Sequence, residues 1–314
     1  VVPALVVCVN VCAGEPAKAW TDPAAAKAED PDFALQGEYK RGNEALQVVA
    51  LGGGKFFTAK LNGGLPGDGW DGKAVSGSLV TTEALKQTLD GFTKVERSSP
   101  TLGAKPPEGA VVLFDGSNID EWNGKMSEDK LLMDGATTKR KFSSFTLHIE
   151  FRMPYKPKGA PGSQDRGNSG VYIFNRYETQ VLDSFGLHYF SNTHAANEWG
   201  AAFQKDLGFK CGSDRTQLCG SLYKFKDPAL NMSYPPLAWQ TYDITFTAPK
   251  FQDGKKVTNA RITTLHNGVK IHDDLELPKG TGAGSTKPEV PEEAIYLQAH
   301  GNPVRFRNVW IKSF

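Results

Sequence analysis

The sequence predicts an all-β protein, built as a two-sheet jelly-roll β-sandwich with a small, mainly β domain before it. Three observations favour this fold. Short segments of alternating apolar and polar residues recur through the chain, turn residues are abundant with 33 Gly and 19 Pro, and long segments with helical periodicity are scarce. A length of 314 residues suits one large domain or two ordinary ones.

The chain starts with an apolar run, VVPALVVCVNVCAG, followed by a polar, Ala-rich stretch. The run is too short to span a bilayer and is typical of the hydrophobic part of a secretory signal peptide. We therefore expect a leader over residues 1–19 and export to the periplasm or cell surface of a bacterium. A lipoprotein attached to the membrane through Cys8 or Cys12 is a weaker alternative. The apolar run would otherwise be a buried β-strand at the amino terminus of the folded protein.

The next segment, residues 30–100, predicts a small domain. LQVVAL and KFFTAKL are apolar runs separated by Gly residues, as in hairpin strands, and the run from Thr81 to Asp90 predicts a short helix. From the sequence, GGLPGDGWDG is expected to expose Trp70 between glycines, but no GK[ST] follows, so this loop is not a phosphate loop. The stretch from Ser98 to Pro107 is the expected linker.

The sandwich itself is expected over residues 108–314, where strand-like segments are regularly spaced. VVLFDGSNIDEW predicts a strand and a turn, and FTLHIEFRMP alternates between residues 145 and 153 as a strand with one face in the core. WQTYDITFTAP and ARITTLHNGVKIHDD follow, and Asn267-Gly268 is the signature of a type I′ hairpin. AIYLQAHG and VRFRNVWIKSF predict the last strands.

The stretch RGNSGVYIFNRYETQVLDSFG, residues 166–186, carries the densest group of hydrogen-bonding side chains. In a strand Glu178 and Gln180 share one face, so a polar pair lies on a strand otherwise suited to burial. Arg166, Asn168 and Ser169 precede it in a Gly-interrupted turn that lets a ligand approach closely. A strand with one solvated face is the alternative.

Polar residues with a period of two occur on four predicted strands, and if these faces belong to one sheet they line a single polar concavity. Such a surface suits a polyhydroxylated ligand, because each sugar hydroxyl needs a partner once water is displaced. The alternative is a solvated face joined by ion pairs of Glu150 with Arg152 or Arg305. The residues concerned are His148, Glu150, Arg152, Glu178, Gln180, Gln298, His300, Arg305 and Arg307.

Charge and cysteine content exclude several function classes. The formal net charge of +1 gives no basis for nucleic acid or an anionic membrane as partner. Two of the four cysteines belong to the leader, and Cys211 and Cys219 are spaced as for a disulfide closing a small loop, with two free thiols as the alternative. No Cys/His spacing indicates a zinc site.

Taken together in order, FDGSNIDEW, LHIEFRMP, RGNSGVYIFNRYETQVLDSFG, CGSLY, WQTYDITFTAP, HNGVKIHDD and LQAHGNPVRFRNVW resemble the 3-keto-disaccharide hydrolase family, formerly described as a domain of unknown function. The resemblance covers about Val111 to Phe314 and implies a concanavalin-like or laminin-G-like jelly roll. Many members have Asp where this chain has Ala299, so any support that such a carboxylate gives His300 is missing here.

The resemblance implies cleavage of a glycoside whose C3 hydroxyl has already been oxidised to a ketone. The ketone acidifies the C2 proton, so elimination and then hydration break the C1 bond. Glu178 and His300 are the expected base and acid, in either order, and Arg305 or Arg166 would neutralise the enolate. The expected substrate-binding residues are Arg166, Asn168, Gln180, Glu150, Arg152, Tyr223, Gln298 and Arg307.

Other functions remain open at this point. A divalent cation held by Glu178 and Asp183 would neutralise the enolate in place of an arginine. The alternation of side chains along a strand, however, places Glu178 and Asp183 on opposite faces. A glycosidase with Glu150 and Glu178 as paired carboxylates is the nearest enzymatic competitor. The non-enzymatic alternative is a lectin-like or cell-surface assembly protein, with a homo-oligomer as one form of it, because this fold supports binding as readily as catalysis.

Overall fold

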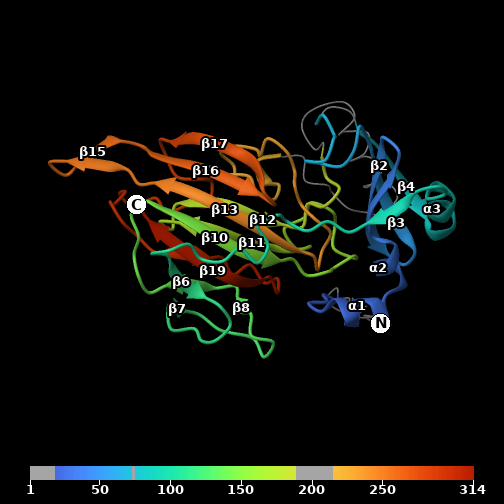
Figure 1. Ribbon diagram of the computed structural model, residues 1–314, viewed down its shortest axis with the longest axis horizontal. Coiled ribbons are helices and arrows are strands. Elements are labelled where there is room, and N and C mark those ends of the chain that lie inside the picture. Colours follow the sequence, from blue (N-terminus) through green and yellow to red (C-terminus); the bar gives the residue numbers. More distant parts are fainter. Residues whose placement is uncertain (1–17, 73–74, 189–214) are drawn as a thin grey trace, which may run out of the picture.

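The computed structural model describes residues 18–72, 75–188 and 215–314, and it has two parts (Figure 1). The N-terminal unit, residues 18–97, is an antiparallel sheet of five strands in the order β4-β3-β2-β1-β5, with three short helices. Its elements are α1 (Pro23–Glu29), α2 (Pro31–Leu35), β1 (Gly37–Arg41), β2 (Glu44–Gly52), β3 (Lys55–Asn62), β4 (Val75–Thr81), α3 (Thr82–Thr88) and β5 (Thr93–Val95). The predicted hairpin of LQVVAL with KFFTAKL is confirmed as β2 and β3, and the predicted helix is confirmed as α3.

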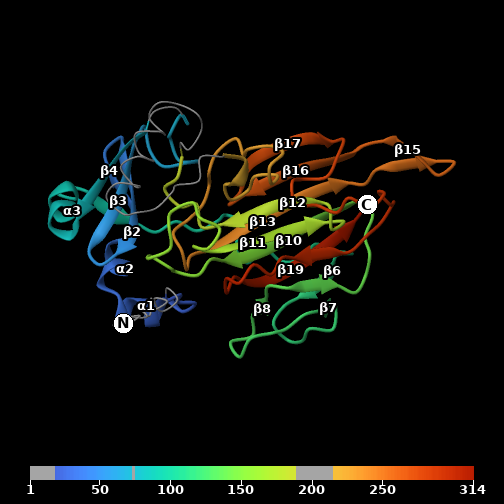
Figure 2. The same ribbon diagram turned by 180° about the vertical axis from the view of Figure 1, so that it is seen from behind.

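The second part is a two-sheet sandwich of antiparallel strands, as predicted (Figures 1 and 2). The seven-stranded sheet has the order β17-β16-β13-β10-β19-β6, with β8 paired to β19, and the five-stranded sheet has the order β12-β11-β18-β9-β7. The strands of the larger sheet are β6 (Val111–Phe114), β8 (Leu132–Met133), β10 (Phe145–Arg152), β13 (Trp239–Thr247), β16 (Ala260–His266), β17 (Val269–Leu277) and β19 (Arg305–Ser313). Those of the smaller sheet are β7 (Trp122–Asn123), β9 (Ala136–Thr138), β11 (Asn168–Ile173), β12 (Tyr177–Leu182) and β18 (Ile295–Leu297).

Two smaller elements complete the described part of this domain. A 3-10 helix covers Arg215–Gln217, and β14 (Lys250–Gln252) pairs with β15 (Lys255–Thr258) in a ribbon that projects at the end far from the N-terminal unit (Figure 1). Asn267 and Gly268 join β16 to β17 with φ of 50° and 77°, which confirms the predicted hairpin turn, since a type I′ turn needs positive φ at both positions.

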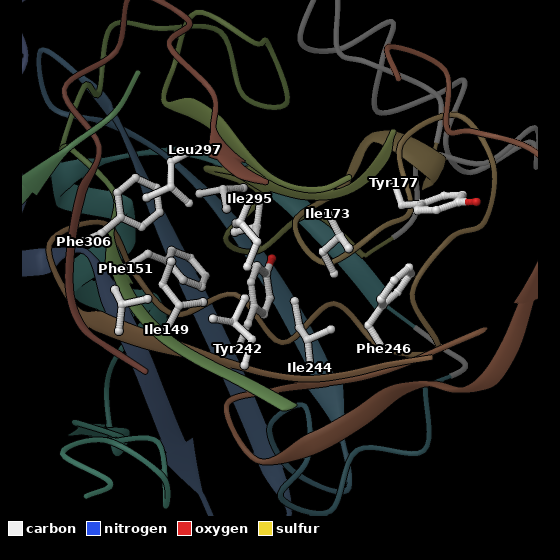
Figure 3. Close-up of a cluster of buried hydrophobic side chains, with 14 of the residues drawn as sticks. Ile149, Phe151, Ile173, Tyr177, Tyr242, Ile244, Phe246, Ile295, Leu297 and Phe306 are labelled. Atoms are coloured by element: carbon white, nitrogen blue, oxygen red, sulfur yellow. The ribbon is translucent and has the colours of Figure 1, made fainter. Parts of the chain in front are cut away.

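The core lies between the two sheets, where alternate residues of each strand meet (Figure 3). Ile149, Phe151 and Ile244 of the larger sheet face Ile173 and Ile295 of the smaller one, and all five are fully buried. The predicted alternation in β10 is therefore confirmed. Because β-strands expose successive side chains on opposite faces, the residues between these core positions point outward from the sandwich.

The two parts are packed together through side chains from loops of the sandwich. Tyr155 packs against Trp20 and Phe33, with ring centroids 5.4 and 5.0 Å apart, and Phe185 joins an apolar cluster with Val49. No helix in the described ranges has the length and apolar character needed to cross a membrane.

Candidate active site

The strands that carry the predicted polar residues belong to two different sheets. β10 and β19 lie in the seven-stranded sheet, whereas β12 and β18 lie in the five-stranded sheet. The expectation of one polar concavity across all four strands is therefore wrong. Apart from His300, which is exposed and lies beyond the end of β18, the residues form two separate groups, one on the outer face of each sheet.

The group on the larger sheet is a closed network beneath the linker, residues 98–107. Glu150 accepts hydrogen bonds from Arg307 Nε at 2.7 Å and from the backbone N–H of Gly103 at 2.6 Å, and His148 lies 2.6 Å from a carboxylate oxygen of Asp243. Burial acts to raise the pKa of Glu150, but its hydrogen bonds, first that with His148, lower it to about 2. The sequence offered two interpretations of this face, a sugar-binding site or a surface joined by ion pairs, and the network resembles the second. The ion-pair partner of Glu150 is Arg307 rather than Arg152 or Arg305.

The two remaining arginines of this face lie directly opposite each other on β10 and β19. Arg152 is the cross-strand partner of Arg305, and its guanidinium lies 4.9 Å from the ring centroid of Trp239 and 3.7 Å from Asp129. Both arginines lie on the sheet that does not contain Glu178. Among the described residues, none of their contacts connects them to Glu178.

Arg166 and Asp183 form a buried ion pair that joins the sandwich to the N-terminal unit. Arg166 is 1% exposed and donates to Asp183 at 2.7 Å, to Pro157 O and Gly159 O in its own loop, and to Ala50 O of β2. Asp183 is thus engaged by a guanidinium and does not fit a role as a metal ligand with Glu178. Within the described ranges, no group of three or more His, Cys, Asp or Glu residues is placed to hold a metal ion.

The group on the five-stranded sheet is arranged around Glu178. Tyr172, its cross-strand partner on β11, donates from its hydroxyl to Glu178 Oε2 at 2.7 Å. The side-chain amide of Gln180 is oriented so that its oxygen and its nitrogen both face suitable hydrogen-bond partners. Its nitrogen donates to Glu178 Oε1 at 3.1 Å and to Ser169 O at 2.9 Å. Gln298 then donates to the Tyr172 hydroxyl at 3.2 Å. Glu178, Gln180 and Gln298, which the sequence predicted as site residues, are therefore brought together.

Burial changes the acidity of this cluster. Glu178 is 1% exposed, and desolvation raises its pKa to about 7, although the hydrogen bond from Tyr172 lowers it. Burial, together with the negative charge of Glu178, raises the pKa of Tyr172 above its usual value. Glu178 is thus poised to gain or lose a proton near neutral pH, whereas the phenol stays in its neutral form.

A cavity of about 570 Å³, called the cleft below, lies beside this cluster. Glu178 does not line it and is separated from it by Tyr172, which does. The rings of Tyr172 and Tyr296 lie 5.8 Å apart, and the Tyr296 hydroxyl accepts the backbone N–H of Ala299. The lining residues are Tyr172, Asn175, Ala283, Gly284, Ser285, Thr286, Lys287, Tyr296, Gln298 and Ala299.

Tyr223 lies next to Glu178 on the other side, as its backbone N–H donates to Glu178 O at 3.2 Å. Its hydroxyl accepts from Gln164 at 2.8 Å. His300 is exposed and does not line the cleft, and Asn168 is buried at the start of β11. The structure therefore brings Tyr223 to Glu178 but leaves His300 and Asn168 outside the cluster.

Three residues of this site were missed in the sequence: Tyr172, Tyr296 and Gln164. Tyr172 alternates with the core residues Val171 and Ile173, so strand parity places it on the face of Glu178. Tyr296 lies two residues before Gln298, so both side chains are expected on the same face of an extended chain. No signal in the sequence marked Gln164, which lies in a loop.

Cys219 is a buried free thiol whose sulfur lies 3.1 Å from the hydroxyl of Tyr242. Burial raises its pKa. Cys211, its predicted disulfide partner, lies outside the described residues, as do Cys8 and Cys12. The predicted disulfide is therefore not supported by the state of Cys219.

Comparison with known proteins identifies one family and a related fold. The family described as "3-keto-alpha-glucoside-1,2-lyase-like domain" matches residues 109–312. A crystal structure of a "putative glycosyl hydrolase" from Parabacteroides distasonis is 28% identical, with a TM-score of 0.51, and the match covers 71% of this chain and 86% of that one. Another from the same organism, with the same description, is 19% identical, with a TM-score of 0.42 and coverage of 66% and 94%. No curated protein matches the chain.

Proposed function

We propose, from the premise that this chain belongs to the family of 3-keto-alpha-glucoside-1,2-lyase-like domains, that it hydrolyses 3-keto-glycosides, including 3-keto-disaccharides. The family and the structural neighbour that is 28% identical support a glycosyl hydrolase in general. The observation that carries the finer proposal is the Tyr172–Glu178 pair beside the cleft, because this chemistry needs a base with a pKa near neutrality.

The proposed reaction has an elimination and a hydration step. Removal of the C2 proton gives an enolate on the C3 oxygen, which expels the aglycone from C1 and leaves an enone. The aglycone oxygen takes a proton from water, the resulting hydroxide adds to C1, and C2 regains a proton. One water is consumed, and the products are the 3-keto-sugar and the free alcohol, without an oxocarbenium ion.

The residues of the cluster have distinct roles in this scheme. The Tyr172 hydroxyl contacts the substrate and takes the C2 proton while its own proton moves to Glu178, so Glu178 is the base that stores the proton. The same pair returns it to C2 after hydration. The Gln298 amide, which lines the cleft and bonds the Tyr172 hydroxyl, is placed to stabilise the enolate oxygen.

The paired-carboxylate mechanism is not favoured. Glu150 and Glu178 lie on the outer faces of two different sheets, with the core between them. They therefore cannot flank one glycosidic bond.

The experiment is reducing-sugar release from a 3-keto-disaccharide and from its unoxidised parent. We expect the wild type to cleave only the keto compound, and Glu178→Gln and Tyr172→Phe each to lose at least about a hundredfold in kcat. His300→Ala tests the remaining candidate from the sequence, and its exposed position predicts a small effect. Cleavage of the parent at a similar rate would overturn the elimination mechanism.

A carbohydrate-binding protein without catalysis is the second candidate. It is favoured by the burial of Glu178, which reaches the cleft only through Tyr172. Binding of the unoxidised disaccharide with no turnover of either compound, in folded protein, would support it.

We also propose that the protein is exported. The support is the apolar run in the sequence, which lies outside the described residues. Fusion of residues 1–30 to a reporter that is active only in the periplasm tests this, and an inactive but intact fusion would contradict it.

A further inference from the structure

The cleft has a neighbour with which it shares a wall. A second cavity of about 290 Å³ lies between the turn after β11 and the segment from Ser285 to Glu293. Asn175, Ser285 and Lys287 line both cavities, so these three residues, called the ridge below, separate the two. The cleft lies on the side of Tyr172, and the second cavity lies on the side of Phe174.

Backbone contacts hold the ridge in place. The N–H of Ser285 donates to Asn175 O at 2.8 Å, and Arg176 donates to the carbonyl of Lys287. A Cβ at Gly284 would collide with the carbonyl of Arg176, so only glycine permits this approach. The segment is anchored at its other end by Thr281, whose hydroxyl accepts the N–H of Glu178 at 3.0 Å. The ridge is therefore tied to the strand that carries the proposed base.

The ridge has hydrogen-bonding capacity that the described residues do not use. The side-chain amide of Asn175 and the ammonium of Lys287 have no hydrogen bond or ion pair in the described part of the chain. Together they offer five donor hydrogens and one carbonyl acceptor on a fixed support. Neighbouring hydroxyls of a sugar ring are ligands of this kind, since each one donates and accepts.

We propose that the ridge binds the sugar ring attached to the leaving oxygen, so that the substrate is a disaccharide or a longer oligosaccharide rather than a glycoside of a small alcohol. This rests on the proposed function. The keto-sugar lies in the cleft against Tyr172 and Gln298, and the next ring crosses Asn175 and Lys287 towards the second cavity. The ridge thus determines the preference for chain length.

The test compares kcat/KM for a 3-keto-disaccharide and for methyl 3-keto-glucoside. We expect the wild type to prefer the disaccharide about tenfold or more, and Asn175→Gly and Lys287→Ala each to reduce this ratio about threefold to tenfold, the effect of one hydrogen bond. Glycine is chosen because Asn175 has a φ of 52°, where alanine would add strain. Lys279→Ala, an exposed lysine outside both cavities, is the matched control and should leave the ratio unchanged.

A wild type without preference, or ridge variants that slow both substrates equally, would overturn the proposal. If no keto compound is turned over, the proposed function fails, and the ridge is tested by calorimetry with the unoxidised disaccharide and methyl glucoside. Tighter binding of the disaccharide, reduced in Asn175→Gly and Lys287→Ala, would then support the ridge as a sugar-binding site. Equal binding of both ligands would reject it.

Discussion

Tyr172 and Glu178 are cross-strand partners on β11 and β12, and the phenol donates to the carboxylate at 2.7 Å. Because directly opposite residues of an antiparallel pair share a face, both side chains lie outside the core and yet are nearly excluded from water. The sheet therefore holds a carboxylate where its charge is poorly solvated. This explains why the pKa of Glu178 is raised to about 7.

The first prediction concerns the pH dependence of activity. In the wild type, kcat/KM for a 3-keto-disaccharide should rise with pH through a midpoint near 7, as Glu178 ionises. The hydrogen bond from Tyr172 lowers the pKa of Glu178, so Tyr172→Phe should move the midpoint of its residual activity to higher pH. Carbon-13 NMR of the Glu178 carboxylate gives the same midpoint without turnover. Tyr296→Phe, which removes a cleft hydroxyl with no bond to Glu178, should not shift it, and an unchanged midpoint in Tyr172→Phe would refute the coupling.

The second prediction is that Glu178→Gln gains stability as it loses activity. Between an unfolded pKa near 4.5 and a folded pKa of about 7, the unfolded chain releases the Glu178 proton and the folded one keeps it, so the wild type loses stability as pH rises through this window. Above it the cost is on the order of 3 kcal/mol. Urea unfolding at pH 8 should show Glu178→Gln to be more stable than the wild type, with the difference vanishing near pH 4. Equal stability at pH 8 would mean that the carboxylate is better solvated than its burial indicates.

The alternation of residues was enough to predict the all-β sandwich, the faces of β10 and the polar character of Glu178 and Gln180. It could not predict which strands are neighbours, because strand order depends on long-range pairing that parity does not encode. Glu150 and Glu178 have the same local pattern, yet one lies under the linker and the other beside the cleft. The linker could not be recognised as a cover, because its contacts come from Thr101 and Gly103, which look like ordinary turn residues.

Arg166 shows a different limit of the sequence. Its position in a Gly-rich stretch next to a polar strand is also that of a ligand-binding arginine, and only the structure shows that its donors are used internally. Two of its carbonyl acceptors lie in its own loop, and the third, on Ala50, belongs to the N-terminal unit. Contacts between units are not visible in local patterns.

The third prediction is that the Arg166–Asp183 pair stabilises both units together. Arg166→Met leaves Asp183 buried without its partner, and it should cost about 3 to 5 kcal/mol in urea unfolding. Arg166→Met combined with Asp183→Asn should cost less than the sum of the single variants, because no unpaired charge is left. Arg41→Met, which breaks an exposed pair with Glu44, is the control and should cost no more than about 1 kcal/mol. If Arg166→Met and Arg41→Met lost a similar amount of unfolding free energy, the buried Arg166–Asp183 pair would not be the stabilising contact proposed here.

The last prediction concerns the linker and His148. Burial acts to lower the pKa of His148, but hydrogen bonds with Asp243 and Glu150 outweigh it, and the pKa is raised above its ordinary value of 6.5. The charged histidine therefore contributes stability that is fully present below pH 6.5 and is lost as pH rises through the raised folded pKa. Thr101 and Gly103 of the linker bond the same two carboxylates, so the linker should loosen with this loss. His148→Gln should be less stable than the wild type at pH 6, and the difference should shrink at pH 9.

Limited proteolysis by chymotrypsin after Leu102 reports on the linker directly. Cleavage in the wild type should be slower at pH 7 than at pH 9, after correction for the pH dependence of the protease on a peptide spanning residues 98–108. In His148→Gln the corrected rate should be high at both values, whereas the exposed His300→Gln should behave as the wild type. The same corrected pH dependence in His148→Gln as in the wild type would show that another group controls the linker. Because the linker covers Glu150 on one sheet while the cleft lies on the other, its release should leave the midpoint of activity near pH 7 unchanged.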